Sequence, residues 1–260
     1  MHQKTFQYIY GPVYSWRLGM SLGVDPISCP QKICNFNCLY CQLGETCLFQ
    51  SERKSFISAQ AIVDEIKTIS LTDIDYITFS GCGEPTLAKN LGTLIRAIKR
   101  VRPEKIAVIT NSSLIHLRDV QDDLAKADFV LAKLDAFSQE SFAAINKGVD
   151  TVLFGELVKG LCAFRKKFSG KLALQIMFMQ ENIMHAKDIA EIAKKIDPDE
   201  VQINTPLRPC AIKPLTKKQM DVIKRAFLDF KTVSVYDVIV KPFDPLDEEK
   251  TVARHGHYRS

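Results

Sequence analysis

The chain has 260 residues, of which 46% are hydrophobic and 25% charged, and this composition excludes general disorder. No stretch approaches the ~18 uninterrupted apolar residues of a membrane span, and no basic head followed by an apolar run marks a secretory signal at the start. The 35 Lys and Arg against 30 Asp and Glu give a net charge of +5, a mild excess compatible with an anionic partner.

Short continuous apolar runs alternate with segments of helical periodicity along the chain. The runs predict strands at 21–27, 74–80, 105–110, 128–134, 171–179, 200–204 and 233–240. Apolar residues at steps of three or four predict helices at 58–70, 89–101, 114–126, 154–168, 189–196 and 216–230. The pattern is typical of a parallel sheet covered by helices. We therefore expect the α/β class, a partial (βα)6 barrel of the TIM type with about six parallel strands.

No linker, repeat or low-complexity segment divides the chain. We expect an N-terminal segment over 1–20, a core domain over 21–240 and a polar, loosely held tail over 241–260. In that tail, His255 and His257 are interpreted as part of a flexible terminus rather than as metal ligands.

The distinctive residues of the chain follow the predicted strands. GCGEPT follows 74–80, TNSS follows 105–110, KLDA closes 128–134 and NTPLRP follows 200–204. In folds of this class the chemistry lies on the loops at the carboxyl ends of the strands. These loops therefore predict one shared pocket mouth, with the cysteine loop leaving the first strand at the same edge.

Three of the eight cysteines, Cys34, Cys38 and Cys41, form a C-x3-C-x2-C cluster. Without an export signal, clustered thiols indicate metal ligands rather than disulfides. A structural zinc site takes four ligands and usually uses C-x2-C pairs, so zinc would need Cys29, Cys47 or a distant histidine as well. Three thiolates on a [4Fe–4S] cube instead leave one iron open to a further ligand. The sequence favours the iron–sulfur cluster, with zinc as the alternative.

The segment CNFNCLYC, with Tyr40 directly before the last cysteine, resembles the signature of the radical S-adenosylmethionine (SAM) superfamily. GPVYSWRLGMSLGVD, SGCGEPTL, TNSSL, KLDA and NTPLRP resemble the branch that groups wyosine (imidazoguanosine) tRNA synthetases with uncharacterised radical SAM proteins. The resemblance covers roughly residues 10–215. It implies a radical SAM core, a [4Fe–4S] cluster on the three cysteines, and SAM chelated to the fourth iron. It further implies reductive cleavage of SAM to a 5′-deoxyadenosyl radical that abstracts hydrogen from a substrate, and it assigns no catalytic side chain.

In that family the loop after the second strand accepts hydrogen bonds from the amino group of SAM. Gly81 and Gly83 let its backbone approach a ligand closely, while Glu84 and Pro85 fix its turn; an ordinary strand-to-helix turn is the alternative. We accordingly expect Gly83→Val to leave the cluster assembled but to block SAM.

Other cofactor contacts implied by the resemblance follow later strands. Asn111 and Ser112 either bind the ribose or carboxylate of SAM or cap a helix. Asp135 either holds a ribose hydroxyl or caps the next helix, and Asn204 and Thr205 either meet the adenine or form a turn. The implied cofactor-binding residues are Tyr40, Gly81, Cys82, Gly83, Glu84, Pro85, Asn111, Ser112, Asp135, Asn204 and Thr205.

Lys133 and Arg208 are the candidates for holding the substrate, although Lys133 is equally compatible with a surface lysine at a strand end. The basic segments 159–171 and 206–231 have the character of a phosphate-binding surface. A tRNA base is therefore one candidate substrate, and a protein, peptide or small metabolite is the alternative. A non-catalytic iron–sulfur or zinc-binding scaffold is the third possibility.

The tRNA-modifying relatives carry extra N-terminal cysteines for a second cluster, whereas only Cys29 precedes Cys34 here. Cys29, Cys47, Cys82 and Cys210 are candidates for a second cluster, and small buried apolar residues are the commoner explanation. The resemblance also implies an external electron donor of the flavodoxin or ferredoxin type. We expect an oxygen-sensitive protein in the cytoplasm.

Overall fold

The computed structural model describes residues 6–239 and 241–256. Within these residues, one sheet of eight strands has the order β1-β2-β5-β6-β7-β8-β9-β10. Its strands are β1 (Ile9–Ser15), β2 (Gly19–Val24), β5 (Tyr76–Phe79), β6 (Lys105–Thr110), β7 (Phe129–Lys133), β8 (Lys171–Met177), β9 (Glu200–Asn204) and β10 (Thr232–Ser234). A two-stranded sheet pairs β3 (Ile33–Cys34) with β4 (Leu48–Phe49).

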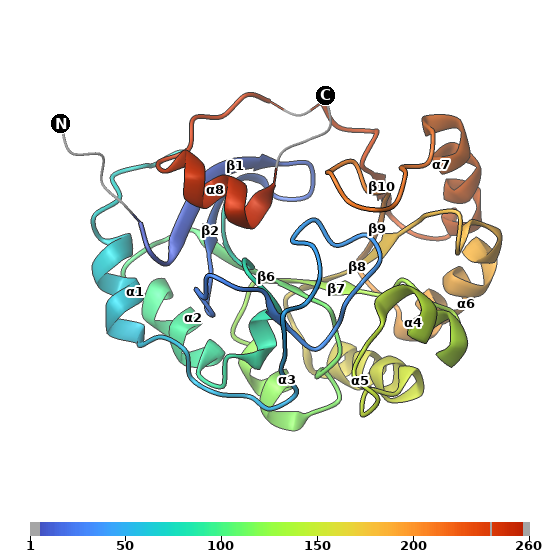
Figure 1. The fold of residues 1–260 in the computed structure, drawn as a ribbon, viewed down its shortest axis with the longest axis horizontal. Coiled ribbons are helices and arrows are strands. Elements are labelled where there is room, and N and C mark those ends of the chain that lie inside the picture. Colours follow the sequence, from blue (N-terminus) through green and yellow to red (C-terminus); the bar gives the residue numbers. More distant parts are fainter. Residues whose placement is uncertain (1–5, 240, 257–260) are drawn as a thin grey trace.

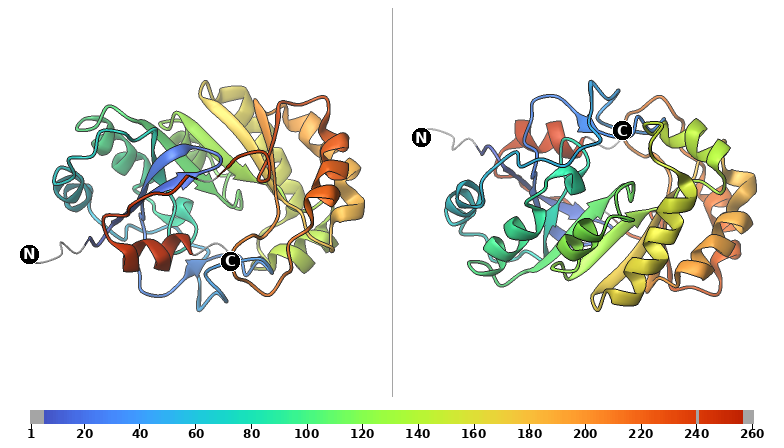
Figure 2. Two further views of the ribbon diagram at one scale, coloured as in Figure 1. Left: turned by 90° about the horizontal axis from the view of Figure 1, so that it is seen from above. Right: turned by 90° about the horizontal axis from the view of Figure 1, so that it is seen from below.

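Helices surround the outer face of the curled main sheet (Figures 1 and 2). They are α1 (Ala59–Ile66), α2 (Leu91–Lys99), α3 (Arg118–Leu124), α4 (Gln139–Asn146), α5 (Phe154–Lys167), α6 (Ala186–Ile196) and α7 (Lys217–Lys224). A further helix, α8 (Glu248–His255), packs across β1 instead. Short 3-10 turns cover Pro85–Leu87, Ile183–His185 and Arg225–Phe227. In the part of the chain that the structure describes, no helix combines the length and apolar character needed to cross a bilayer.

The main sheet confirms the predicted half-barrel. From β2 to β10 each neighbouring pair is parallel, and only β1 pairs antiparallel with β2. The strands are short buried runs because the core packs against one face and the helices against the other. All the strand-end loops of the parallel strands therefore open at one edge, as the strand-end motifs predict.

The predicted strands at 105–110 and 200–204 have the observed bounds of β6 and β9. The strand predicted at 233–240 is shorter, because a turn closes directly after β10. The N–H of Ser234 donates to Asp237 Oδ2 (2.9 Å), and the N–H of Asp237 donates to the carbonyl of Ser234 (2.9 Å). Residue 240 lies outside the described residues.

The polar C-terminal segment differs from the expectation of a loosely held tail, which is wrong for residues 248–255. Asp247 caps α8 by accepting from the N–H of Lys250 (3.0 Å), and α8 packs across β1 (Figure 1). The helix buries the side chains of Thr251 and Arg254. His255 belongs to this helix, whereas His257 lies outside the described residues.

The first strand of the sheet, β1, was not predicted from the sequence. The carboxylate of Glu65 on α1 fixes the start of β1, because it accepts from the N–H groups of Tyr8 (2.9 Å) and Ile9 (2.8 Å). A hairpin then joins β1 to β2, and its turn places Trp16 and Arg17 near the strand ends. The N-terminal segment thus supplies both a strand and part of the pocket wall.

Candidate cofactor and active site

The cysteine segment lies directly against the GCGEP loop. Ile33 of β3 pairs with Gly83: its N–H donates to the carbonyl of Cys82 (3.0 Å), and its carbonyl accepts from the N–H of Glu84 (3.2 Å). These bonds hold β3, which ends at Cys34, beside the loop that follows β5. The predicted proximity of the cysteine motif and GCGEP is therefore confirmed.

A cavity of about 250 Å³ opens between these two loops. The three thiols of the motif, Cys34, Cys38 and Cys41, all lie in its wall. Of the residues implied to bind SAM, the same wall contains Tyr40, Gly81, Gly83, Glu84 and Asn111. Both substrate candidates, Lys133 and Arg208, also line it. Residues from five separate segments of the chain thus meet in one hollow.

The donor set fits an iron–sulfur cluster. Three thiolates around one hollow are the ligands that such a cluster takes. Within the described residues, no group of three or more His, Cys, Asp or Glu side chains is close enough to hold a single metal ion. The three thiols therefore line the hollow without converging on one point.

Burial gives two of these thiols a high proton affinity. Desolvation raises the pKa of Cys34 to about 12 and that of Cys38 to about 11. Both thiols therefore carry their protons near pH 7 until iron replaces them. Amide donors approach both sulfurs: Asn111 Nδ2 lies 3.6 Å from Cys34 Sγ, and Asn146 Nδ2 lies 3.5 Å from Cys38 Sγ. Hydrogen bonds to cluster sulfurs tune the reduction potential, and Asn146 on α4 was not predicted.

Glu84 ties the GCGEP loop to the end of β6. Its carboxylate is buried and accepts from the hydroxyls of Thr86 and Thr110 (both 2.6 Å) and from the N–H of Asn111 (2.6 Å). Burial raises the pKa of Glu84, and the hydrogen bonds from Thr110 and Thr86 oppose that rise. The role of this residue in fixing the turn is confirmed by these contacts.

The two glycines of the loop are required by contacts within the chain. A Cβ on Gly83 would lie 1.7 Å from the carbonyl oxygen of Ile33, and one on Gly81 would lie 2.3 Å from Cγ of Asp25. Gly81 also has φ +135°, a conformation that side chains disfavour. The close approach at Gly83 is therefore to the backbone that carries Cys34, which overturns the expectation that valine there would leave the cluster assembled.

Replacing Gly83 with alanine is expected to prevent cluster assembly. The added carbon overlaps the backbone next to Cys34, and overpacking of this kind costs about 1–3 kcal/mol while displacing that segment. Iron and sulfide analysis after anaerobic reconstitution measures the effect. Gly155→Ala is the matched control, because apart from its chain neighbours and the backbone of its own helix no described heavy atom lies within 4 Å of the Cβ position there. A full iron content in Gly83→Ala would contradict the prediction.

Asp135 lies behind the cavity wall and anchors Tyr40. Its carboxylate accepts from the Tyr40 hydroxyl and from Asn146 Nδ2 (3.1 Å), and it pairs with the ammonium of Lys133 (3.2 Å). Burial and the nearby Asp135 charge raise the pKa of Tyr40 well above its usual value. The cap of α4 is Ser138, so the alternative of Asp135 as a helix cap does not hold.

The remaining implied SAM contacts lie elsewhere. Asn204 and Thr205 line a second, smaller hollow. They also shape a turn, since the N–H of Thr205 donates to Asn204 Oδ1 (2.9 Å) and its hydroxyl accepts from the N–H of Leu215 (2.8 Å). Ser112 is fully buried. Within the described residues, the walls of the larger cavity do not include Cys82, Pro85 or Ser112.

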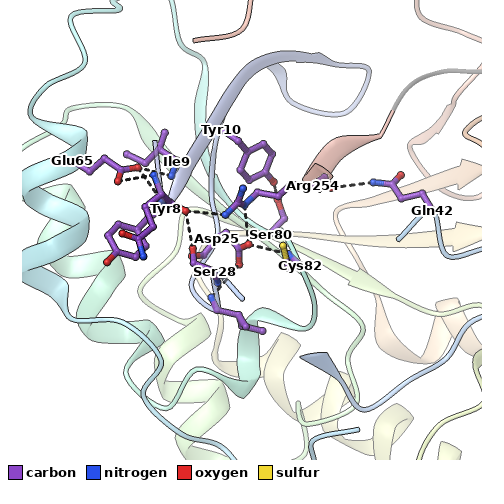
Figure 3. A network of polar contacts seen from close by, with 12 residues as sticks. Tyr8, Ile9, Tyr10, Asp25, Ser28, Gln42, Glu65, Ser80, Cys82 and Arg254 are labelled. Atoms are coloured by element: carbon purple, nitrogen blue, oxygen red, sulfur yellow. Dashed lines mark hydrogen bonds and ion pairs between the residues drawn. The ribbon is translucent and has the colours of Figure 1, made fainter. Parts of the chain in front are cut away.

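The C-terminal helix supplies Arg254 and His255 to the wall of the cavity, a feature that the sequence did not predict. Figure 3 shows the polar contacts of Arg254 with the neighbouring segments. The guanidinium of Arg254 donates to the buried carboxylate of Asp25 (2.9 Å), which also accepts from the N–H of Cys82 (3.1 Å). Gln42 of the cysteine loop donates to the carbonyl of His255 (2.7 Å). Arg254 and His255 both line the cavity, so α8 links the cysteine loop to the GCGEP loop.

The other cysteines have varied surroundings. Cys47 is exposed, and Cys210 lines a separate hollow together with Cys38 and Cys41. Burial, reinforced by Asp25, raises the pKa of Cys82 to about 12. Cys82 is therefore a neutral, half-buried thiol within the loop.

One of the two basic segments lies away from the cavity. Arg165 near the end of α5 pairs with Asp199, directly before β9 begins, and Lys171 at the start of β8 pairs with Glu200. Segment 159–171 therefore reaches the amino edge of the sheet, opposite the strand-end loops, where Arg165 and Lys171 pair with acidic residues.

Comparison with known proteins agrees with this geometry. The model of the Radical SAM superfamily matches residues 28–193. The UPF0026 protein slr1464 of Synechocystis sp. is 38% identical over 215 residues, which are 82% of this chain and 80% of that protein. Among solved structures, Streptococcus suis SuiB bound to S-adenosylmethionine has TM-score 0.60 at 15% identity, over 79% of this chain and 48% of SuiB. Archaeal TYW1 has TM-score 0.57 at 13% identity, over 82% of this chain and 72% of that chain. The chain therefore belongs to the radical SAM superfamily, whose enzymes use a [4Fe–4S] cluster and SAM.

Proposed function

We propose that this enzyme cleaves SAM reductively and that the 5′-deoxyadenosyl radical so formed abstracts hydrogen from a substrate, for which a tRNA base is the first candidate. One observation carries the proposal: β3 is hydrogen-bonded to the GCGEP loop, so that three thiols and that loop form one cavity wall. When bound, the cluster supplies the electron that cleaves SAM.

The residues of the chain have distinct tasks in this proposal. Cys34, Cys38 and Cys41 hold the cluster and leave one iron open. Asn111 and Asn146 direct amide donors at two of these sulfurs. The α8 helix covers one side of the cavity and limits the access of water to it. An external donor of the flavodoxin or ferredoxin type provides the electron, and the cytoplasm is the compartment that suits eight free thiols.

The choice of a tRNA base is supported by the resemblance of the strand-end motifs to the wyosine branch. Lys133 and Arg208 in the cavity wall are suited to an anionic or carbonyl-bearing substrate. The basic end of α5 gives no support, because it lies at the opposite edge of the sheet. A protein, peptide or small metabolite is the alternative substrate class.

The test is formation of 5′-deoxyadenosine by the anaerobically reconstituted, chemically reduced protein. We expect a slow basal yield with SAM alone and a faster yield with tRNA from a strain that lacks the protein, together with a new nucleoside in that tRNA. Absence of 5′-deoxyadenosine from fully loaded protein would contradict the enzymatic proposal. A basal yield that tRNA leaves unchanged would exclude the tRNA base and favour the alternative class.

A further inference from the structure

The end of α4 is hydrogen-bonded to the cysteine loop on both sides of Cys38. The N–H of Asn37 donates to the carbonyl of Asn146 (3.0 Å), and the N–H of Leu39 donates to the carbonyl of Ile145 (3.0 Å). Both bonds join backbone groups, so they do not depend on the side chain of Asn146. They hold the Asn146 amide beside the Cys38 sulfur, with Nδ2 3.5 Å from Sγ.

Asp135 determines which atom of the Asn146 amide faces the sulfur. Besides its contact with Cys38, Nδ2 lies 3.1 Å from Asp135 Oδ2 and 3.4 Å from the Tyr40 hydroxyl. That hydroxyl donates its single proton to Asp135, so toward the amide it can only accept. An amide oxygen in this place would face a carboxylate with no hydrogen between them. The nitrogen must therefore be the atom that points toward Cys38 Sγ.

Four groups hold the Asp135 carboxylate in place. Its side chain is 0% exposed, and the hydroxyl of Tyr40 and the amide of Asn146 both donate to Oδ2. At Oδ1 the carboxylate accepts from the N–H of Met177 (2.8 Å) and pairs with the ammonium of Lys133 (3.2 Å). The ammonium compensates the buried negative charge. The carboxylate is therefore a fixed acceptor for the Asn146 amide.

The side chains of Asp135 and Asn146 lie outside the large cavity. Within the described residues, the wall of that cavity includes Cys38 and Tyr40 but neither Asp135 nor Asn146. The resemblance to the radical SAM superfamily implies a ribose contact for Asp135, whereas here its carboxylate is directed at Tyr40 and Asn146. Any effect of Asp135 on the chemistry must therefore pass through the cysteine loop.

A hydrogen bond to a cluster sulfur stabilises the reduced form more than the oxidised form. Reduction adds one electron, and part of its charge resides on the coordinating sulfurs. A donor binds more strongly to the more negative acceptor, and burial keeps water from screening this difference. The amide of Asn146 beside Cys38 Sγ therefore favours reduction of a cluster bound to this thiolate.

We propose that Asp135 is a positioning residue that holds the amide of Asn146 toward Cys38 Sγ and thereby raises the reduction potential of the cluster. The potential itself depends only on the cluster. Its consequence, easier electron transfer from the external donor before SAM is cleaved, rests on the proposed function.

The experiment is a redox titration of the anaerobically reconstituted protein without SAM, in which electron paramagnetic resonance detects the reduced cluster. Asn146→Leu removes the amide but keeps both backbone bonds to the loop, so the iron content should be unchanged. At a fixed applied potential, we expect the ratio of reduced to oxidised cluster to fall about tenfold, which corresponds to about 59 mV for a one-electron couple. Gln139→Leu, which removes an exposed amide at the other end of α4, is the matched control and should keep the wild-type potential.

A double-mutant cycle tests the part that Asp135 takes. Asp135→Asn removes the carboxylate that orients the amide, so Asn146→Leu should shift the potential less in this background than in the wild type. Calorimetry should show that reconstituted Asp135→Asn binds SAM as tightly as the wild type does. Equal shifts of the potential in the two backgrounds would overturn the positioning role. Weaker binding of SAM would overturn it too, since the carboxylate would then act on the cofactor.

An unchanged potential in the loaded Asn146→Leu variant would contradict the proposal directly. Should this variant take up no iron, Asn146→Ser, whose side chain is too short to reach Cys38 Sγ, repeats the titration. Loss of the cluster from both variants would show that the amide is needed for assembly rather than for the potential, and the proposal would fall. If the potential behaves as expected but the wild type forms no 5′-deoxyadenosine, the proposed function fails and the positioning role stands.

Discussion

Replacing Cys38 with alanine is expected to abolish the iron–sulfur cluster and the formation of 5′-deoxyadenosine together. The variant retains only Cys34 and Cys41 of the motif, and two thiolates do not hold a cube that needs three protein ligands and an open iron. We expect iron, sulfide and product to fall to the level of protein that was never reconstituted.

Cys47→Ala is the matched control for this variant. Cys47 lies on the same loop, only nine residues from Cys38 in the sequence, but its side chain is exposed. The Cys47→Ala variant should retain the iron content and product yield of the wild type. Retention of a full cluster in Cys38→Ala would show that another group supplies the ligand, and the assignment of the three thiols would be wrong.

Replacing Arg254 with methionine is expected to lower the free energy of unfolding by about 3–5 kcal/mol, the usual cost of removing one partner of a buried ion pair. The side chains of Arg254 and Asp25 are 6% and 1% exposed, so the substitution leaves a carboxylate without its counter-charge. Asp25 also accepts from the N–H of Cys82, so loss of Arg254 should destabilise the GCGEP loop as well. Urea unfolding measures the change.

Lys250→Met on the same helix is the control, because the described structure gives the ammonium of Lys250 no ion pair. Its effect should stay within about 0.5 kcal/mol, as for surface substitutions. The double variant Asp25→Asn with Arg254→Met should recover part of the loss, since the uncompensated charge is gone. A loss below about 1 kcal/mol in Arg254→Met would place this pair among weak surface interactions.

Local patterns were sufficient to predict most of the sheet. The runs 105–110 and 200–204 are β6 and β9 to the residue. The first contains a continuous apolar run, as expected of a strand covered on both faces, whereas in the second Val201 and Ile203 alternate with polar residues. In parallel sheets the loops that follow the carboxyl ends of the strands lie at one edge. This rule predicted that GCGEP, TNSS and the cysteine loop lie close together, as the cavity wall shows. Some local signals were overlooked. Asp247, Glu248 and Glu249 before Arg254 and His255 have the charge order of a helix, and they begin and end α8.

The sequence by itself determined the superfamily, the cluster ligands it implies and the parallel half-barrel, because each is encoded in short segments with fixed spacing. Only the tertiary structure decided how distant segments meet. Arg254 and Asp25 are 229 residues apart and pair because α8 folds back over β1. Gly83 is required by the carbonyl of Ile33, and Lys133 of β7 donates to Gln175 Oε1 on the neighbouring strand β8. These contacts depend on side-chain packing between elements, which periodicity along the chain does not record.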